Sequence, residues 1–409
     1  MRILLSVFAC SPLWGSEPGV GWRWTNELAK HHKVTVLTHA YFREHISAHP
    51  SDEISERIEF VYYELPGVRI HPHKLLNSRI YYLLWQTGAW WKARSLVRDV
   101  HFDLVHHLTW GTFRFPSFMG FLGVPFVYGP LGGAERAPVR LRRSLPIREA
   151  LFEFVRDGLL YLSYLDPFIW SSLRNADLIL AKTEETKQFI STFSSAKTVV
   201  MQEIGCGELH APTPVGTNDK SESVRLFFAG RLIGWKGAHF AIRALAKVRA
   251  SGVDAVLYVA GDGPMRGYLQ SLANDLDVHD QVVFLGMVQR SQLLKQYADM
   301  DLFIFPSLHD SSGNVVLEAL ASSLPVICLD LGGPKYFVDD SCGRVIETIN
   351  RTEDDVVTAL AHEISIISND AFLHRSLKVG AYEKALRLGW ESQIGKVYSV
   401  IQSTLFQDV

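Results

Sequence analysis

Two cations stand five positions apart in a glycine-rich stretch of the second half of the chain. The stretch reads GRLIGWKG, so Arg231 and Lys236 share a flexible backbone that begins at Gly230. An apolar run precedes it and a helical pattern follows, which predicts a turn between a strand and a helix. Paired cations beside a helix N-terminus suit a diphosphate. Taken alone, such a pattern is more often a solvated turn.

A second turn, GDGP, follows the next apolar run, at residues 261–264. Gly261 and Gly263 lack a Cβ, so their backbone can approach a ligand closely. The alternative is a tight strand-to-helix turn without any ligand. The turn therefore supports a binding site only together with its neighbours.

An acidic pair, Asp310 and Glu318, brackets the start of a helix expected at Asn314. The first amides of a helix have no partner within it, so the N–H groups of Gly313, Asn314 and Val315 suit an anionic oxygen. Glu318 lies one turn into an apolar helix, where we expect it to reach a ligand rather than remain simply solvated. Two carboxylates eight residues apart can bind hydroxyls on two parts of one ligand.

Short apolar runs alternate with helical patterns along both halves, which predicts parallel sheets covered by helices on both faces. Ligands of such sheets bind outside the carboxyl ends of the strands, where the residues named above lie. The predicted strands are residues 3–9, 34–38, 58–62, 104–108, 125–128 and 178–181 in the first half and 224–229, 255–260, 281–285, 301–305 and 325–329 in the second.

Composition indicates a two-domain globular protein without a nucleic-acid partner. A chain of 409 residues exceeds the size of one hydrophobic core, and 41 basic against 43 acidic residues give a formal charge of −2. The four cysteines are scattered, as in proteins of a reducing compartment, and no window is apolar enough to span a membrane. We expect buried thiols and a cytoplasmic location, with the N-terminal apolar run forming a strand rather than a leader.

Together these motifs resemble the retaining glycosyltransferases of the GT-B fold, family 4, over nearly the whole chain. In that family the GR-x4-KG element binds the donor's diphosphate, and Arg231 and Lys236 match its cations. The GDGP turn also matches, and Glu318 matches the second acid of an E-x7-E helix, which holds the ribose. The first acid, which contacts the sugar, is Asp310 here, and Ser312 stands where phenylalanine usually precedes the glycine.

The resemblance extends to the first half of the chain. Gly19 and Gly21, in the stretch GSEPGVG, match a glycine-rich loop that approaches the donor phosphates. The DLVHH segment matches a D-x-x-H element beside the transferred sugar, which makes His106 and His107 both candidates for a catalytic role. A hydrogen-bonded structural histidine is an equally good interpretation.

The resemblance implies two Rossmann-like domains facing a cleft, with an acceptor domain over residues 1–205, a linker over 206–223, a donor domain over 224–386, and a last helix over 387–409 that packs on the first domain. It implies transfer of a sugar from a nucleotide-sugar to a glycan or lipid-linked acceptor, in bacterial cell-surface polysaccharide synthesis, without metal or other cofactor. Arg231, Lys236 and the helix amides would stabilise the departing phosphate, assisted by Asp310 and the histidines.

Three other functions remain open at the level of sequence. A nucleotide-sugar epimerase of related fold would share the phosphate site but need no acceptor. A non-catalytic sugar-nucleotide sensor is suggested by Asp310 and Ser312, which depart from the family pattern. A nicotinamide dehydrogenase lacks support, because no strand is followed by G-x-G-x-x-G and a later acid.

Residues 69–98 are basic and aromatic, and suit either weak peripheral contact with anionic lipid or a helix whose aromatics are core.

Overall fold

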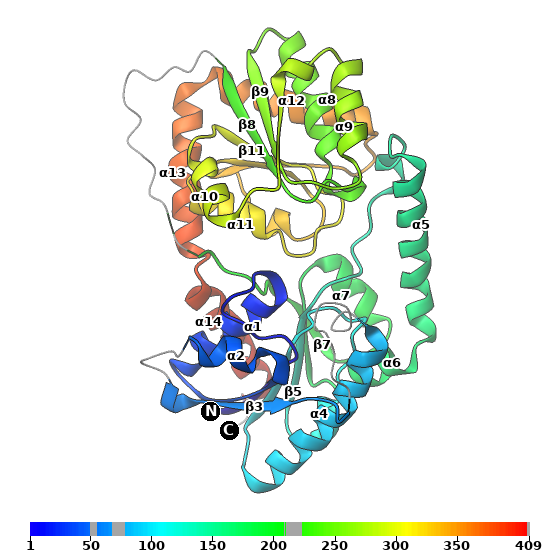
Figure 1. Ribbon diagram of the computed structural model, residues 1–409, viewed down its shortest axis with the longest axis vertical. Helices are drawn as coiled ribbons and strands as arrows, with labels where there is room; N and C mark the ends of the chain where they lie inside the picture. The colour runs from blue at the N-terminus through cyan, green and yellow to red at the C-terminus, as the bar shows by residue number, and fades with distance from the viewer. Residues whose placement is uncertain (50–54, 68–77, 208, 210–222, 407–409) are drawn as a thin grey trace. The chain divides into compact units, whose positions relative to one another are not determined.

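The computed structural model describes residues 1–49, 55–67, 78–207, 209 and 223–406. The chain forms two compact units (Figure 1). Unit 1 comprises Met1–Ala134, Leu159–Ile204 and Trp390–Val409, and unit 2 comprises Glu135–Gly158 and Gly205–Gly389. Residues 135–158, which the sequence assigned to the first domain, thus cluster with the second, and most of the predicted 206–223 linker lies outside the described residues.

Unit 1 is built on a seven-stranded parallel sheet with the order β3-β2-β1-β4-β5-β6-β7. β1 is central, so that Leu4 pairs with Thr35 of β2 on one side and with Val105 of β4 on the other. The chain order reverses between β1 and β4, which makes their carboxyl ends the switch point of this sheet. The strands are Arg2–Val7, Lys33–His39, Ile58–Tyr63, Leu104–Thr109, Phe126–Leu131, Leu178–Ala181 and Lys197–Val200, from β1 to β7.

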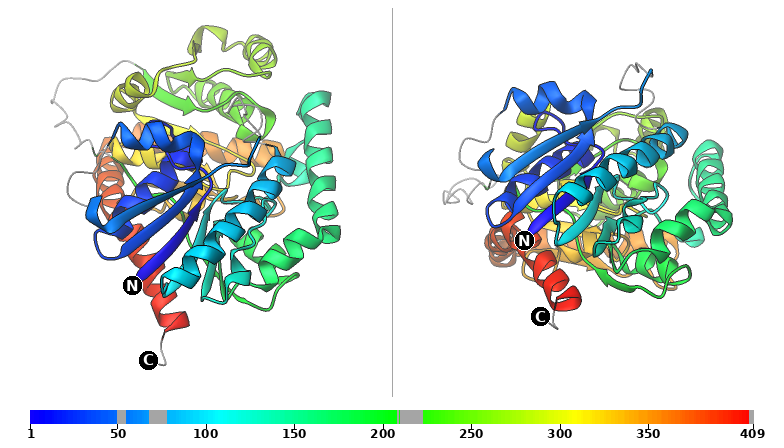
Figure 2. Two further views of the ribbon diagram at one scale, coloured as in Figure 1. Left: turned by 60° about the horizontal axis from the view of Figure 1, so that its bottom comes forward. Right: turned by 90° about the horizontal axis from the view of Figure 1, so that it is seen from below.

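Helices cover this sheet and bury its apolar strands. The helices of unit 1 are α1 (Ser16–Ala29), α2 (Arg43–Ser47), α4 (Arg79–Asp99), α6 (Pro167–Arg174), α7 (Glu184–Ser191) and α14 (Trp390–Leu405). α14 packs on α1 and β6, and Figure 2 shows it beside the N-terminal elements. In α4, Tyr82 and Trp85 are fully buried, whereas Trp91 is exposed. Residues 69–77 of the predicted basic and aromatic stretch lie outside the described residues, and the part in α4 is partly core and partly surface.

Unit 2 is built on a six-stranded parallel sheet with the order β10-β9-β8-β11-β12-β13. Its strands, from β8 to β13, are Val224–Ala229, Ala255–Ala260, Val282–Gly286, Leu302–Phe305, Val326–Leu329 and Gly343–Ile346. Its helices, from α8 to α13, are Ala238–Ala250, Arg266–Asp275, Arg290–Ala298, Asn314–Ala321, Glu353–Asn369 and Ala371–Arg387. The prediction of two doubly wound parallel α/β sheets is confirmed.

Helix α5 (Ile147–Leu162) carries the boundary between the units within it, after Gly158. Short 3-10 helices complete the structure: Ala40–Phe42, Ser55–Arg57, Met119–Leu122, Val139–Leu141, Ser163–Leu165, Gly234–Lys236, His279–Gln281 and Pro334–Tyr336.

All four cysteines are buried free thiols, as expected from the sequence. Among the described residues no single helix is long and apolar enough to cross a membrane, and α12 with α13 meets that test only as a pair bent by 103°.

Candidate active site

The predicted diphosphate residues lie at the switch point of the unit 2 sheet. β8 and β11 are adjacent in the sheet, although two strands, β9 and β10, and the helices around them separate these two along the chain. Residues 230–237 follow β8, and residues 306–313 follow β11. Because parallel strands end at the same edge, the two loops meet there: the amide of Leu308 donates to the carbonyl of Trp235 at 2.8 Å. This edge is where ligands of open α/β sheets bind.

Lys236 and Asp310 form an ion pair between these two loops. The other oxygen of the Asp310 carboxylate accepts hydrogen bonds from the amides of Ser312 and Gly313, at 3.2 and 3.1 Å. Burial alone would raise the pKa of Asp310, but the Lys236 ammonium and the two amides outweigh it, so that the pKa lies below its usual value. Asp310 therefore stays ionised at neutral pH and holds the lysine at the sheet edge.

Arg231 presents its guanidinium to solvent at the same edge. Its side chain is exposed, and its carbonyl accepts from the amide of Ile233 at 2.9 Å. Lys236 is placed more firmly, because its ammonium also lies 4.4 Å from the ring centre of Trp235 and 5.2 Å from that of Phe305. The site thus combines one positioned cation with one exposed cation.

The glycines of the GDGP turn allow two loops to pack backbone against backbone. A Cβ on Gly261 would lie 2.0 Å from the carbonyl oxygen of Gly230, and one on Gly263 would lie 2.4 Å from that of Leu232. The amide of Leu232 donates to the carbonyl of Asp262 at 3.0 Å. These glycines were expected to let a ligand approach, and the structure gives them a different neighbour. Their placement braces the loop that carries Arg231.

Replacement of Gly261 by alanine is expected to lower the melting temperature by roughly 2–10 °C. The residue has a φ of +134°, which strains an L side chain, and its Cβ would meet a backbone carbonyl that cannot move freely. Differential scanning calorimetry measures the change. Gly267→Ala is the matched control, since a Cβ there meets nothing within 4 Å, and it should leave the melting temperature unchanged or higher. Equal melting temperatures for the two variants would contradict this account.

Helix α11 begins at the predicted residue, with Gly313 as its N-cap at a φ of +75°. The amide of Gly313 donates to Asp310. Among the described residues, the amides of Asn314 and Val315 are those of the predicted anion site that have no side-chain acceptor. Asn314 is exposed and Val315 half-buried. The free-amide prediction for Gly313 therefore needs correction: an aspartate can cap its own loop.

Glu318 lies in α11 with its carboxylate 3.1 Å from the guanidinium of Arg290. Its side chain is 19% exposed, and burial raises its pKa, although Arg290 and the Tyr297 hydroxyl act in the opposite direction. A carboxylate kept partly dehydrated in this way is suited to accept hydrogen bonds from ligand hydroxyls.

Four residues at this site escaped the sequence interpretation. His309 stacks on Trp235, with ring centres 4.4 Å apart, and its Nε2 lies 2.9 Å from the carboxylate of Glu153. Glu149 accepts a hydrogen bond from the amide of Gly234 at 2.7 Å. Trp235 and His309 stand inside the motifs already recognised. Glu149 and Glu153 come from α5, where acids spaced by four in an apolar helix were the available signal.

The two histidines predicted to be catalytic lie in the core of unit 1. His106 is fully buried, with Nε2 donating to the carbonyl of Gly129 at 2.7 Å and Nδ1 accepting from the hydroxyl of Tyr398 at 3.0 Å. His107 is also fully buried, with its ring nitrogens 2.9 Å from Ser6 Oγ and 3.2 Å from the Tyr82 hydroxyl. Burial lowers the pKa of His106 to about 4 and that of His107 to about 3. These contacts account for both rings structurally, and their catalytic role stays a prediction.

Gly19 and Gly21 lie within helix α1 rather than in a loop. A Cβ on Gly19 would come within 2.6 Å of the Trp14 carbonyl oxygen, and one on Gly21 within 2.4 Å of a methyl group of Val7. The expected loop is helical because Pro18 fits the first turn of a helix, where its missing N–H is not needed. Both glycines serve close packing of α1, and donor contact by either stays a prediction.

The carboxyl edge of the unit 1 sheet carries a buried group of charges. The ammonium of Lys182, which follows β6, lies 2.5 Å from the carboxylate of Glu203 and 3.7 Å from that of Glu17. Glu17 also accepts from the amide of Gly111 at 3.1 Å, and its side chain is 21% exposed. The sequence interpretation did not single out these residues. Lys182 and Glu203 each follow closely on the end of a strand, whereas Glu17 lies in the first turn of α1.

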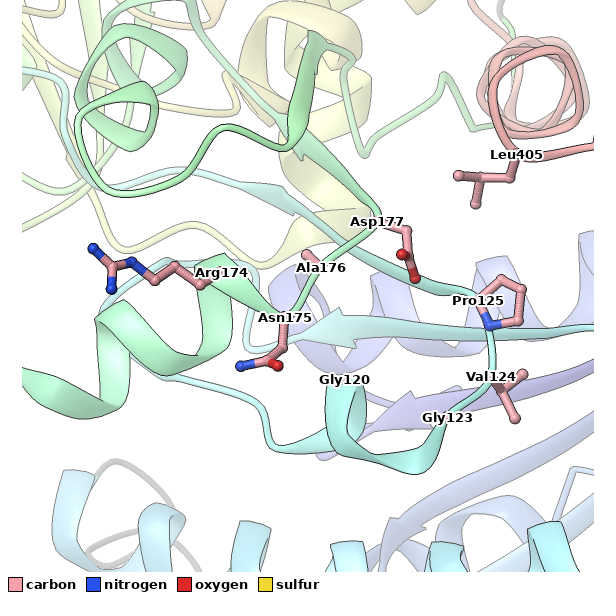
Figure 3. Close-up of a pocket in the computed structure, with 9 residues that line it drawn as sticks. All are labelled: Gly120, Gly123, Val124, Pro125, Arg174, Asn175, Ala176, Asp177 and Leu405. Atoms are coloured by element: carbon pink, nitrogen blue, oxygen red, sulfur yellow. The ribbon is translucent and has the colours of Figure 1, made fainter.

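A pocket of about 520 Å³ lies at the opposite edge of the unit 1 sheet (Figure 3). Pro125 and Asp177 in its lining precede β5 and β6, so it opens at the amino ends of the strands. Ligand sites of parallel sheets lie at the carboxyl ends, and this pocket is therefore separate from the candidate site. Among the described residues, no group of three or more His, Cys, Asp or Glu side chains could hold a metal ion.

Comparison with known proteins shows the family of this chain. Residues 223–370, which include the loops just described, match the family model for glycosyl transferases group 1. An alpha-monoglucosyldiacylglycerol synthase from Streptococcus pneumoniae is 30% identical over 305 residues, covering 69% of this chain and 66% of that protein. The chain belongs to the glycosyl transferases group 1 family.

A further relative is the lipopolysaccharide core biosynthesis glycosyltransferase LpsE from Rhizobium meliloti, 31% identical over 185 residues, or 45% of this chain and 53% of LpsE. The chain spans 30% to 53% of the length of three curated relatives that it matches. The structure of HepE from Anabaena in complex with UDP gives a TM-score of 0.60 at 17% identity, over 98% of this chain and all of that one. At this identity the likeness shows the fold, which is GT-B.

The range that matches the family model contains the predicted residues of the candidate site in unit 2. The matched range contains both switch-point loops of unit 2 and helix α11. Arg231, Lys236, Asp310 and Glu318, each predicted as a site residue of this family, occupy one sheet edge and the helix that starts there.

Proposed function

We propose that this glycosyl transferases group 1 protein transfers a sugar from a nucleotide-sugar donor to a glycan or lipid-linked acceptor. The observation that carries the proposal is the ammonium of Lys236, held by Asp310 at the switch point of the unit 2 sheet. A fixed cation at this edge is suited to a diphosphate. HepE, a protein of the same fold, was solved with UDP. Retention of configuration is part of the proposal and rests on family resemblance.

The chemistry demanded of the protein is stabilisation of a leaving phosphate. As the bond between sugar and diphosphate breaks, negative charge grows on the departing oxygens. Lys236 is already oriented toward this edge, so its charge needs little reorganisation during the reaction. Arg231 and the amides of Asn314 and Val315 supply further positive potential from β8 and from the start of α11. The proposal requires no metal ion.

The donor's hydroxyl groups would meet the carboxylates. Glu318 is partly dehydrated yet accessible. To bind a ribose it must give up its ion pair with Arg290, and the free-energy cost is small because the Arg290 side chain is 69% exposed. Asp310, whose oxygens are already engaged by Lys236 and two amides, would act mainly through that lysine. The acceptor would bind unit 1, where Glu17 offers a half-buried carboxylate at the carboxyl edge.

The setting we propose is bacterial cell-surface polysaccharide or glycolipid synthesis, at the cytoplasmic side of the membrane. Two relatives support this setting by their names, one in lipopolysaccharide core biosynthesis and one in glucosyldiacylglycerol synthesis.

Nucleotide-sugar donors are expected to raise the melting temperature of the protein. A ligand at 100 times its dissociation constant stabilises the folded state by about 2.7 kcal/mol, which a thermal-shift assay resolves. A panel of UDP-, GDP- and ADP-sugars would identify the base, and the free nucleotides would separate its contribution from that of the sugar. Absence of a shift with every compound, in protein shown to be folded by circular dichroism, would contradict donor binding.

A non-catalytic sugar-nucleotide sensor is a second candidate, because the carboxylate of Asp310 has its oxygens engaged inside the protein. A sensor would show the thermal shift but no transfer to any glycan or lipid-linked acceptor. An epimerase would convert the donor without acceptor. Chromatography of the sugar-nucleotide after incubation, with and without acceptor extracts, distinguishes the three activities.

A further inference from the structure

Helix α5 exposes a run of large apolar side chains. Within nine positions of unit 2, Ile147 is 87% exposed, Phe154 74% and Leu151 59%, and Phe152 and Val155 are at least half exposed. Monomeric proteins rarely leave such side chains contiguous on one surface. We call these five residues, Ile147, Leu151, Phe152, Phe154 and Val155, the apolar face. Figure 1 shows the helix α5 that carries them.

The opposite face of α5 carries three acids that contact other residues of unit 2. Glu149 accepts from the amide of Gly234, and Glu153 from His309, in the two donor loops. Asp157 pairs with Arg142 at 2.7 Å. Residues four apart in a helix share one side, so these three acids form a single inward stripe. The exposure of the apolar face therefore follows from the helical period and not from a frayed segment.

The charged residues around the apolar face indicate what kind of surface it binds. The three acids of residues 139–162 all lie on the inward stripe, whereas Arg140, Arg143 and Arg148 near the start of the helix are exposed. The outer surface thus combines phenylalanine, leucine and isoleucine with arginine and bears no carboxylate. An interfacial helix on an anionic bilayer has this composition: an apolar face that enters the acyl boundary, with flanking cations at the headgroups.

We propose that α5 docks on the surface of an anionic lipid bilayer through its apolar face. The inference rests on the proposed function, because docking would bring the protein to the membrane that holds a lipid-linked acceptor. A helix with its side chains is about 10–12 Å across. Docking would therefore hold the donor loops at Gly234 and His309 about one helix diameter from the lipid headgroups.

The test is flotation of the full-length protein with vesicles. We expect binding to vesicles of phosphatidylcholine with phosphatidylglycerol, weaker binding to phosphatidylcholine alone, and a decline with added salt. The double variant Leu151→Ser/Phe154→Ser should bind the anionic vesicles at least tenfold more weakly. Phe372→Ser is the matched control, since Phe372 is a single phenylalanine, 80% exposed, on α13 of the same unit.

The assay needs neither donor nor acceptor, so its result is independent of the proposed activity. Circular dichroism and a melting temperature equal to that of the wild type establish that the double variant is folded. Equal binding of wild type and double variant, or no binding to anionic vesicles, would overturn the proposal. So would a stable dimer in light scattering that dissociates in the double variant, because the apolar face would then be covered by a second copy.

Discussion

Lys236→Ala is expected to lower the rate of sugar transfer by roughly 10²- to 10³-fold, the usual cost of losing one preorganised donor to a developing oxyanion. The lysine is fixed from two sides, by the carboxylate of Asp310 and by the rings of Trp235 and Phe305. Its charge is therefore in place before the phosphate begins to leave. Steady-state kinetics with the donor identified by thermal shift would show the loss mainly in kcat.

Arg231→Ala should produce a fall of similar size, although its exposed side chain must be ordered by the donor first. Lys247→Ala is a suitable control, because Lys247 belongs to unit 2 but pairs with Asp354 at 2.9 Å, away from the two loops. Asp310→Asn separates charge from placement: it keeps Lys236 but removes the carboxylate that positions it. Near-normal turnover of Lys236→Ala would exclude these loops as the diphosphate site.

Glu318→Gln should stabilise the ligand-free protein at neutral pH while abolishing the stabilisation by donor. Burial raises the pKa of Glu318 in the folded state, so ionisation disfavours folding. For a carboxyl with a raised pKa this cost is present above the folded-state pKa and disappears as the pH falls below the unfolded-state value. The variant should therefore melt higher than wild type at about pH 7, and the difference should vanish at about pH 4.

The loss of stabilisation by donor in Glu318→Gln should be larger than the change in stability of the ligand-free protein. Loss of the hydrogen bonds from ribose to a partly dehydrated carboxylate should remove most of the shift of about 2.7 kcal/mol expected at saturating donor. Glu347→Gln serves as the control, since Glu347 follows β13 outside the candidate site. A variant that retained the full donor-induced shift would show that Glu318 does not contact the nucleotide.

The sequence predicted the strands that show apolar runs and missed two short strands at the sheet edges. β6, β8 and β9 begin and end where the apolar runs do, because both faces of these strands are covered. β7 and β13 were missed. Both have only four residues, both lie at the edge of a sheet, and each includes a cation, Lys197 or Arg344, so neither shows an apolar run.

The sequence could predict those site residues that directly follow strands of the same parallel sheet. Lys236 and Asp310 stand after two different strands, and the rule for parallel sheets places them together without any knowledge of side chains. The contact of His309 with Glu153 spans 156 positions and joins the second half of the chain to a helix of the first. No periodicity within either segment encodes that pairing. The same reason explains why residues 135–158 were assigned to the other domain.

The order in which the chain visits its two units limits how the protein can be divided. The boundaries after Ala134, Gly158, Ile204 and Gly389 mean that the chain changes unit four times. A fragment that stops at residue 204 would lose α14, whose Val397 and Ile401 are buried and whose Tyr398 bonds to His106. Such a fragment would carry an open core with an unpaired imidazole. To express unit 1 alone, the last twenty residues would have to be joined back to it, with a short linker in place of residues 135–158.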